Sequence, residues 1–362
     1  MNKIYLCFLI LFSAFFLSGC TSSSTKTPLY NSGIYKSYDA GASWNEKSFV
    51  GREDDRVYSI SDSLVFDLSF SPFSNKILAV STKNNGVYIS ENQAESWSPL
   101  KTNPASISIS SFDPKYRESF YVAYGNKLER TSDLGEYWNN LYTDSESNIT
   151  VITPDPVRLD DLYLGFENGK LLKSTTYGKN WKKIYEFEST IKDIYLVSSS
   201  DIYVLLANNK IYYSNNRSHS DEFEILDLGF DPKNILEMEF NSDYSKMYVI
   251  DGSKIYYSNN YGASFNSLNL LNSNERYIDD FDINLKNPNV MYYSIGNMIY
   301  KTSDVGNTWT SSNTNSNSKI EKVLSDPFNP NVLYIGFSNF KVIKQTSFFC
   351  EFFGFAFPYA CE

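Results

Sequence analysis

The stretch Thr302-Ser303-Asp304-Val305-Gly306-Asn307-Thr308-Trp309 decides the fold, because its pattern recurs along the chain. Two other stretches, 37–44 and 131–138, fit the same pattern, which is [Ser/Thr]-x-Asp-x-Gly-x-x-Trp. All five tryptophans of the chain occupy the last position of this repeat motif. The motif residues, including those of weaker copies, are Ser37, Asp39, Gly41, Trp44, Ser90, Asn92, Trp97, Thr131, Asp133, Gly135, Trp138, Ser174, Gly178, Trp181, Ser258, Asn260, Gly262, Phe265, Thr302, Asp304, Gly306 and Trp309.

The spacing of the motif predicts the architecture. Counting a degenerate copy at Ser214 and a faint one at Thr346, the intervals after the first are 40 to 44 residues. A period of about 40–45 residues, with several short strands in each unit, is typical of a β-propeller blade. Runs such as Val65–Phe70, Lys76–Val80 and Gly86–Ile89 predict the first three strands of a unit. We therefore predict an all-β protein made of four-stranded blades.

The repeat motif resembles the Asp-box, or bacterial neuraminidase repeat, and the resemblance covers roughly residues 33–350. It implies that each motif forms the hairpin between the third and fourth strands of a blade. In such a turn a short carboxylate or amide accepts hydrogen bonds from backbone amides, and the glycine adopts a positive φ. We therefore interpret Asp39, Asp133 and Asp304 as structural residues and not as catalytic acids.

The number of blades depends on how the ring closes. Seven complete units run from about Val65 to Phe353, and one additional hairpin, Gly33–Lys36 with Ser43–Lys47, precedes them. Either this hairpin completes the final blade, which leaves no exposed strand edge, or it belongs to an eighth, partial blade. We favour a single propeller of seven blades, with eight as the alternative.

The N-terminus predicts export and a lipid anchor. Lys3 precedes an apolar run that is short for a membrane span, and Leu17-Ser18-Gly19-Cys20 resembles the bacterial lipobox. The resemblance implies cleavage before Cys20 and acylation of that cysteine by diacylglycerol and a palmitate-like chain; an uncleaved anchor is the alternative. We predict a signal peptide at 1–19, a lipidated polar tether at 20–32, the propeller at 33–349 and a tail at 350–362. The protein would then lie on the outer face of the bacterial cytoplasmic membrane, or on the outer membrane if the envelope has one.

Composition excludes several classes of function. The chain of 362 residues has a net charge of −10, which argues against nucleic-acid binding because phosphate recognition needs a basic surface. With one histidine, His219, and four cysteines, we expect no metal and no cofactor. Cys350 and Cys361 are expected to form a disulfide in the tail, with two free thiols as the alternative. The acidic pairs Asp160-Asp161 and Asp279-Asp280 are interpreted as solvated and not as calcium ligands.

The connections between strands indicate where a ligand would bind. In Asp-box families the boxes face away from the ligand surface, which is built by second-to-third-strand turns and by connections between blades. Most of these connections are short here, and the exception is Ser48 to Ser63. Its candidate binding residues are Arg52, Glu53, Asp54, Asp55 and Arg56. Because short loops make a shallow face, a macromolecular partner is favoured over a small molecule.

An enzymatic function is the competing interpretation, because sialidases and some endoglucanases carry these boxes. Sialidases hold a carboxylate with three arginines, one in an Arg-Ile-Pro motif, and this chain has no such motif and seven arginines in all. The endoglucanases resemble two propellers around a cleft, whereas this chain is long enough for one. A glycoside hydrolase with paired carboxylates stays open, although no spacing selects a pair.

Two non-enzymatic families look more similar. Photosystem II assembly and stability factors are single exported propellers, some of them lipoproteins, but their arginine-rich patch is not reproduced here. Sortilin-type receptors bind peptides but add a cysteine-rich module that this chain lacks. We therefore predict a monomeric, lipid-anchored scaffold that binds a protein, a peptide or a glycan at its loop face without catalysis.

Overall fold

The computed structural model of the chain describes residues 33–53, 56–61, 63–83, 85–100, 108–197, 200–215, 222–271 and 276–339. Cys20, Cys350, Cys361, His219 and the motif copy at Thr346 lie outside the described residues, as do the predicted signal peptide and tether. All regular elements of the described part are β-strands. No helix in that part has the length and apolar character needed to span a membrane.

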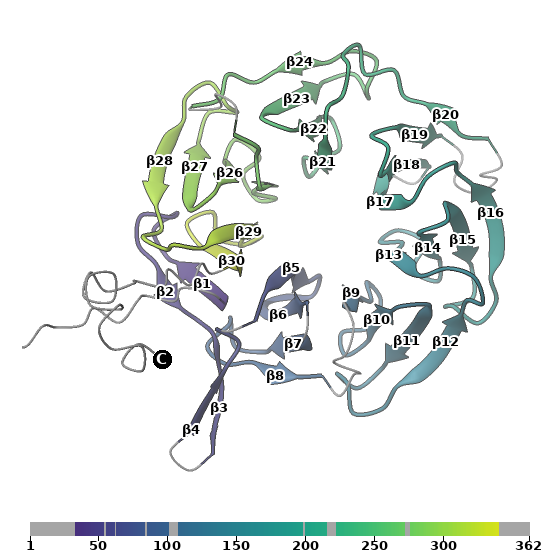
Figure 1. Cartoon of the computed structure of the whole chain (residues 1–362), viewed down its shortest axis with the longest axis horizontal. Coiled ribbons are helices and arrows are strands. Elements are labelled where there is room, and N and C mark those ends of the chain that lie inside the picture. The colour runs from purple at the N-terminus through teal and green to yellow at the C-terminus, as the bar shows by residue number, and fades with distance from the viewer. Residues whose placement is uncertain are drawn as a thin grey trace, which may run out of the picture. The chain divides into compact units, whose positions relative to one another are not determined.

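Seven four-stranded antiparallel sheets form a ring, so the predicted seven-bladed β-propeller is confirmed (Figure 1). Blade one contains β5 (Val65–Ser71), β6 (Ser74–Thr82), β7 (Gly86–Ser90) and β8 (Ser98–Pro99). Blade two contains β9 (Ser108–Phe112), β10 (Phe120–Tyr124), β11 (Lys127–Thr131) and β12 (Asn139–Thr143). Blade three contains β13 (Ile149–Pro154), β14 (Leu162–Phe166), β15 (Lys170–Ser174) and β16 (Lys182–Glu186). Blade four contains β17 (Ile191–Val197), β18 (Asp201–Leu206), β19 (Ile211–Ser214) and β20 (Glu224–Ile225). Blade five contains β21 (Ile235–Phe240), β22 (Met247–Asp251), β23 (Lys254–Ser258) and β24 (Asn266–Ser267). Blade six contains β25 (Asp280–Ile283), β26 (Met291–Ile295), β27 (Met298–Thr302) and β28 (Thr310–Asn313).

The seventh blade closes the ring with strands from both ends of the described chain. Its sheet order is β2-β1-β30-β29, from β29 (Lys319–Ser325), β30 (Leu333–Asn339), β1 (Gly33–Ser37) and β2 (Asn45–Glu46). The register of β1 against β30 runs from Gly33 opposite Phe337 to Ser37 opposite Leu333. The additional hairpin therefore completes the final blade. The prediction that all seven units after Val65 are complete was wrong for the last of them. Its third strand is β1 from the start of the described chain, and β1 occupies the edge of β30 where a strand following β30 would have paired.

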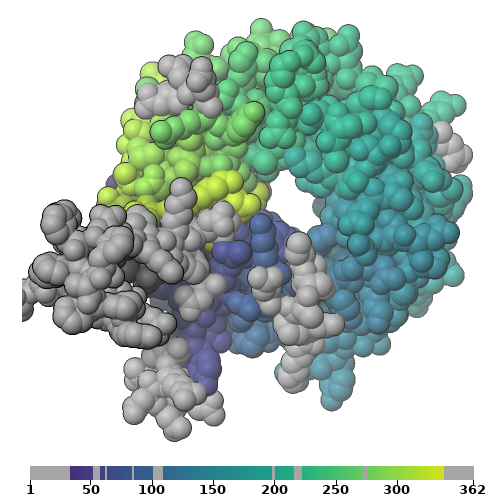
Figure 2. Space-filling view, in the orientation of Figure 1, coloured from purple at the N-terminus to yellow at the C-terminus, as the bar shows by residue number. Residues whose placement is uncertain are grey.

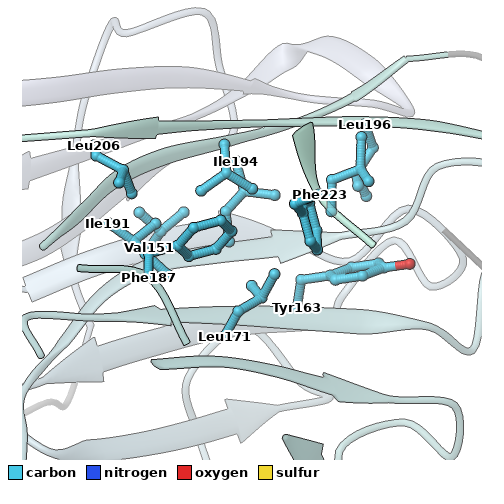
Figure 3. Close-up of a cluster of buried hydrophobic side chains, with 11 residues drawn as sticks. Val151, Tyr163, Leu171, Phe187, Ile191, Ile194, Leu196, Leu206 and Phe223 are labelled. Carbon is cyan, nitrogen blue, oxygen red and sulfur yellow. The ribbon is translucent and has the colours of Figure 1, made fainter. Parts of the chain in front are cut away.

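The hydrophobic core lies between the blades. Each contact between neighbouring sheets buries its own cluster, as Figure 3 shows for blades three and four. There Val151 and Tyr163 of blade three meet Ile191, Ile194 and Leu206 of blade four, all of them buried. Because side chains of a strand alternate between the two faces, every blade contributes to two such clusters. The ring is thus stabilised by seven similar interfaces and not by one central core.

A buried tyrosine recurs on the second strand of six blades, which explains part of the tyrosine content. These residues are Tyr121, Tyr163, Tyr203, Tyr248, Tyr292 and Tyr334. In three blades the cross-strand partner, which precedes the repeat motif, is a cation over the ring: Arg130 at 5.7 Å from Tyr121, Lys173 at 5.2 Å from Tyr163 and Lys36 at 5.1 Å from Tyr334. Cation–π contacts of this kind contribute about 0.5–2 kcal/mol each.

Candidate functional site

The up-and-down order of the strands gives the ring two different ends. First-to-second-strand turns and third-to-fourth-strand turns lie at one end, which we call the motif face because it carries the repeat motifs. Second-to-third-strand turns and the connections between blades lie at the other end, which we call the loop face. A channel runs between the two faces, and its opening is visible at the centre of Figure 2.

The repeat motifs are built alike in six blades. In the first of them the Ser37 hydroxyl accepts the Gly41 N–H at 2.8 Å and donates to Asp39 at 2.8 Å. Asp39 in turn accepts the N–H of Ser43 at 2.8 Å and its hydroxyl at 2.6 Å. Hydrogen bonds from the Ser43 hydroxyl, the Ser43 N–H and the Ser37 hydroxyl lower the pKa of Asp39 to about 2. A carboxylate engaged in this way braces a turn and has no proton to donate near neutral pH.

The motif glycine is needed for two reasons. Gly135 adopts a φ of +99°, which side-chain-bearing residues rarely tolerate, and a Cβ there would lie 2.7 Å from Cδ2 of Leu100 in the preceding blade. The same approach recurs between Gly178 and Leu141 at 2.8 Å and between Gly262 and Leu226 at 2.9 Å. The motif therefore sets the contact between neighbouring blades as well as the turn.

Replacement of Gly135 by alanine should destabilise the fold by about 2–3 kcal/mol, from backbone strain and the clash with Leu100 together. Gly229→Ala is the matched control, because Gly229 also has a positive φ but no atom within 4 Å of the added Cβ. Urea unfolding of both variants measures the difference. Equal losses of stability would show that the contact with Leu100 contributes nothing.

The candidate binding segment folds as a hairpin outside the ring. β3 (Phe49–Glu53) and β4 (Arg56–Ser59) form a separate two-stranded sheet, which Figure 1 shows projecting beyond β8. Its base is fixed, since the Trp97 N–H donates to the Phe49 carbonyl at 2.9 Å. Phe49 and Tyr58 are exposed. The backbones of Arg52, Glu53 and Arg56 lie in the two strands, whereas Asp54 and Asp55 fall outside the described residues.

The first strand of each blade borders the channel and has a sheet partner on one side. Several of its free backbone groups are satisfied by side chains from the preceding blade. Carboxylates accept N–H groups at three places: Glu237 from Phe281 at 3.0 Å, Asp280 from Val323 at 2.6 Å and Asp282 from Ser325 at 3.1 Å. These carboxylates therefore join neighbouring innermost strands, and they bring an acidic lining to the channel.

One lysine lies among these acids. Lys322 Nζ is 2.9 Å from Asp280 and 3.6 Å from Glu237, so the innermost strands of blades five, six and seven meet at this ammonium group. Burial lowers the pKa of Lys322, but the charges of Asp280, Glu237 and Asp67 outweigh it and hold that pKa well above its usual value. Lys322 therefore stays charged and partly neutralises the channel.

Burial is the largest cause of the pKa shifts of the channel acids. It raises the pKa of Asp193 and of Asp282 to about 6, and it raises the pKa of Glu239 well above its usual value. Lys322 opposes all three shifts. The interpretation of Asp280 as a solvated residue was wrong, because closure of the ring buries it against β29. The signal in the sequence was the placement of Glu237, Asp280 and Lys322 about one repeat apart on successive first strands.

The other three residues of the two acidic pairs form ion pairs with lysines. Asp160 pairs with Lys115 at 2.9 Å, Asp161 with Lys173 at 2.9 Å, and Asp279 with Lys319 at 3.1 Å. Within the described residues no group of histidine, cysteine, aspartate and glutamate side chains has the arrangement of a metal site. The strands that border the channel contain no arginine, so they offer no arginine clamp for a substrate carboxylate.

A hollow of about 750 Å³ lies at the rim between blades four and five, away from the channel. It is found where Phe265 takes the motif position that tryptophan fills in five other copies. Phe230 and Tyr256 stack at 3.7 Å in its wall. The lining includes the acidic residues Glu224 and Asp227.

No protein-family model and no curated protein matches the chain. Among solved structures it is similar to a GH74 xyloglucanase from Xanthomonas campestris, with a TM-score of 0.63 and 14% identity over 76% of this chain and 51% of that one. A GH74 enzyme from Niastella koreensis gives a TM-score of 0.63 and 16% identity over 84% and 53%. The chain thus spans about half the length of these enzymes.

Propellers of similar size are also matched. YCF48 from Cyanidioschyzon merolae has a TM-score of 0.60 and 14% identity over 76% of this chain and 95% of that one. YCF48 bound to a D1 peptide has a TM-score of 0.59 and 15% identity over 76% and 94%. At these identities the likeness establishes the propeller fold and no more.

Proposed function

We propose that the chain is an exported, lipid-anchored propeller that binds a polypeptide partner as a scaffold and catalyses no reaction. The observation that carries this proposal is the β3–β4 hairpin. It is a two-stranded sheet outside the ring, with exposed Phe49 and Tyr58 at its base. Within the described residues this sheet has no third strand, and a strand edge beside exposed aromatic rings suits the addition of an extended peptide strand, in which main-chain hydrogen bonds and side-chain contacts combine.

The structure of YCF48 bound to a D1 peptide supports the same kind of function by analogy, since a protein of similar fold binds a peptide there. Three channel carboxylates accept hydrogen bonds from backbone N–H groups of the next blade. These bonds stabilise the fold, which supports a non-catalytic role for the carboxylates. The lipid anchor rests on the sequence around Cys20. Mass spectrometry of the N-terminal peptide tests it, and an unmodified Cys20 would contradict it.

Capture of a partner tests the hairpin. The ectodomain, residues 21–362, is immobilised and exposed to extract of its own cell envelope. We expect one protein to be retained by the wild type and lost from the Phe49→Ala/Tyr58→Ala double variant. Tyr137→Ala is the control, since Tyr137 is also an exposed aromatic residue, at 77% of its surface, but lies on the motif face. Equal retention by all three proteins would overturn the proposal that the hairpin binds the partner.

A glycoside hydrolase is the second candidate, and a specific observation favours it. Such enzymes need one protonated and one ionised carboxyl group near neutral pH. The channel supplies acids of both kinds in principle, because burial raises the pKa of Asp282 to about 6 and that of Glu239 well above its usual value. Release of reducing sugar from xyloglucan by the wild type, abolished by Glu239→Gln, would establish this alternative.

A further inference from the structure

Apolar side chains gather on the motif face in a repeated position. The first-to-second-strand turns of five consecutive blades each present at least one exposed apolar side chain, with between 37% and 55% of its surface accessible. In the order of blades six, seven, one, two and three, these residues are Leu285, Phe328, Phe73, Tyr116, and Val157 with Leu159. Single exposed apolar residues are ordinary, but a series repeated on the corresponding turns of neighbouring blades points to an interaction surface. We call this series the apolar arc.

The turns of the apolar arc are held rigidly. Each of the five contains at least one proline, and in each a buried side chain accepts a backbone N–H of the turn. Asp326, for example, accepts the N–H groups of Phe328 at 2.8 Å and Asn329 at 3.1 Å, and Asp113 accepts that of Lys115 at 2.8 Å. Preorganised contact residues lose little entropy when they bind, so the arc is suited to recognition.

Blade five lacks this pattern in the corresponding turn, and residues 198–199 of the blade-four turn lie outside the described residues. The turn of blade five, Asn241–Lys246, has neither proline nor an exposed apolar side chain among its residues. The described second-to-third-strand turns of the loop face are rich in asparagine and glycine and expose no large apolar residue. The arc is therefore a property of one side of the motif face and not a general feature of the turns.

A hollow lies at the channel mouth beside the arc. It has a volume of about 260 Å³ and is lined by Phe70, Pro72, Phe112, Pro114, Pro154 and Ser111, with Asp67, Ser69 and Ser110. A space of this size is large enough for one large side chain. The Ser69 hydroxyl is buried and lacks a hydrogen-bond partner among the described residues. The hollow thus combines an apolar wall with an unmet polar group.

The charge of the hollow favours a cation. Asp67 lies two residues before Ser69 on β5, so both side chains are on the same face of the strand. Burial raises the pKa of Asp67, and Lys322 is the positive charge that opposes this shift. Asp67 is the one charged residue among those that line the hollow, and a carboxylate in a recess with apolar walls attracts a cation.

We propose that the motif-face mouth of the channel is a docking site for a polypeptide that inserts one lysine or arginine side chain into the hollow toward Asp67. In this proposal, apolar residues of the polypeptide on either side of that lysine or arginine pack against Phe73 and Tyr116. A bilayer is less suited to this surface, because the carboxylate of Asp67 in the hollow repels anionic lipid and a flat membrane leaves the hollow unfilled. This site is on the face opposite the loop face and does not depend on the proposed function of the hairpin.

Two synthetic peptides test the proposal: Ac-Leu-Lys-Leu-amide and Ac-Leu-norleucine-Leu-amide. Norleucine has nearly the length of lysine without its charge. We expect titration calorimetry or NMR at pH 7 to give about tenfold tighter binding of the lysine peptide than of the norleucine peptide, because a charge-assisted hydrogen bond is involved. Asp67→Asn, which preserves volume, should abolish this preference, and Phe73→Ala with Tyr116→Ala should weaken binding of both peptides at least threefold.

Tyr277→Ala is the matched control, since Tyr277 is exposed on the loop face, and it should bind like the wild type. Phe73 and Tyr116 are exposed, so their variants report on the site even if Asp67→Asn unfolds. Equal binding of the lysine and norleucine peptides to the wild type would overturn the proposal. Sedimentation with phosphatidylglycerol vesicles that depends on Phe73 and Tyr116, without any preference for the lysine peptide, would overturn it in favour of a membrane surface. The hairpin double variant Phe49→Ala/Tyr58→Ala should bind these peptides like the wild type.

Discussion

Deletion of residues 33–47 should abolish cooperative folding of the propeller. These residues provide β1 and β2, and β1 pairs with β30 along five successive residues. Ile34 is fully buried, and loss of one buried isoleucine side chain alone costs about 2–5 kcal/mol. Because the total stability of a domain is about 5–15 kcal/mol, removal of two strands and their contacts should exceed what the remaining blades supply. Circular dichroism with urea unfolding should show no cooperative transition.

A rearranged chain is the control for this deletion. Gly33 lies opposite Phe337 in the sheet, so the start of β1 is close to the end of β30. Moving residues 33–47 behind Asn339, with a short turn between them, keeps every strand and makes the closure of blade seven a local hairpin. This variant should fold with a midpoint near that of the wild type. A deletion variant that unfolds cooperatively at the wild-type midpoint would contradict the role of β1 in closing the ring.

The repeat motif predicted the blades because its effects are local. Ser37, Asp39 and Gly41 interact within one turn, so the sequence pattern contains the whole structural unit. Closure could not be decided in the same way. It depends on pairing between Ser37 and Leu333, which are distant in the chain, and both seven and eight blades satisfied the periodicity.

The candidate site was predicted in part. The segment from Ser48 to Ser63 was recognised as an unusual connection, but nothing in its residues indicated a hairpin that leaves the ring. The channel was missed because a residue such as Asp280 looks solvated until its blade is placed against the next. The apolar arc was missed for a related reason: Phe328 lies between two prolines, and the prolines indicate a turn without indicating which residues its neighbours present.

Replacement of Lys322 by methionine should destabilise the fold by about 3–5 kcal/mol at pH 8, because it leaves Asp280 and Glu237 without their shared cation. For a domain of this size the melting temperature should fall by about 10 °C. Lys319→Met is the matched control on the same strand. Lys319 pairs with Asp279 at 3.1 Å but is more exposed, so its loss should cost about 1 kcal/mol or less.

The dependence of this effect on pH separates lost charge compensation from lost packing. The pKa of Asp193 and of Asp282 is raised to about 6 in the folded state, against about 3.9 for an unfolded aspartate. A carboxyl group with a raised pKa contributes stability below pH 4, and that contribution is lost as the pH rises through 6. Lys322 lowers both pKa values, so its removal raises them further and extends the loss to higher pH. The deficit of Lys322→Met should therefore be small at pH 4 and grow toward pH 8, whereas a deficit that is constant across this range would assign the role of Lys322 to packing alone.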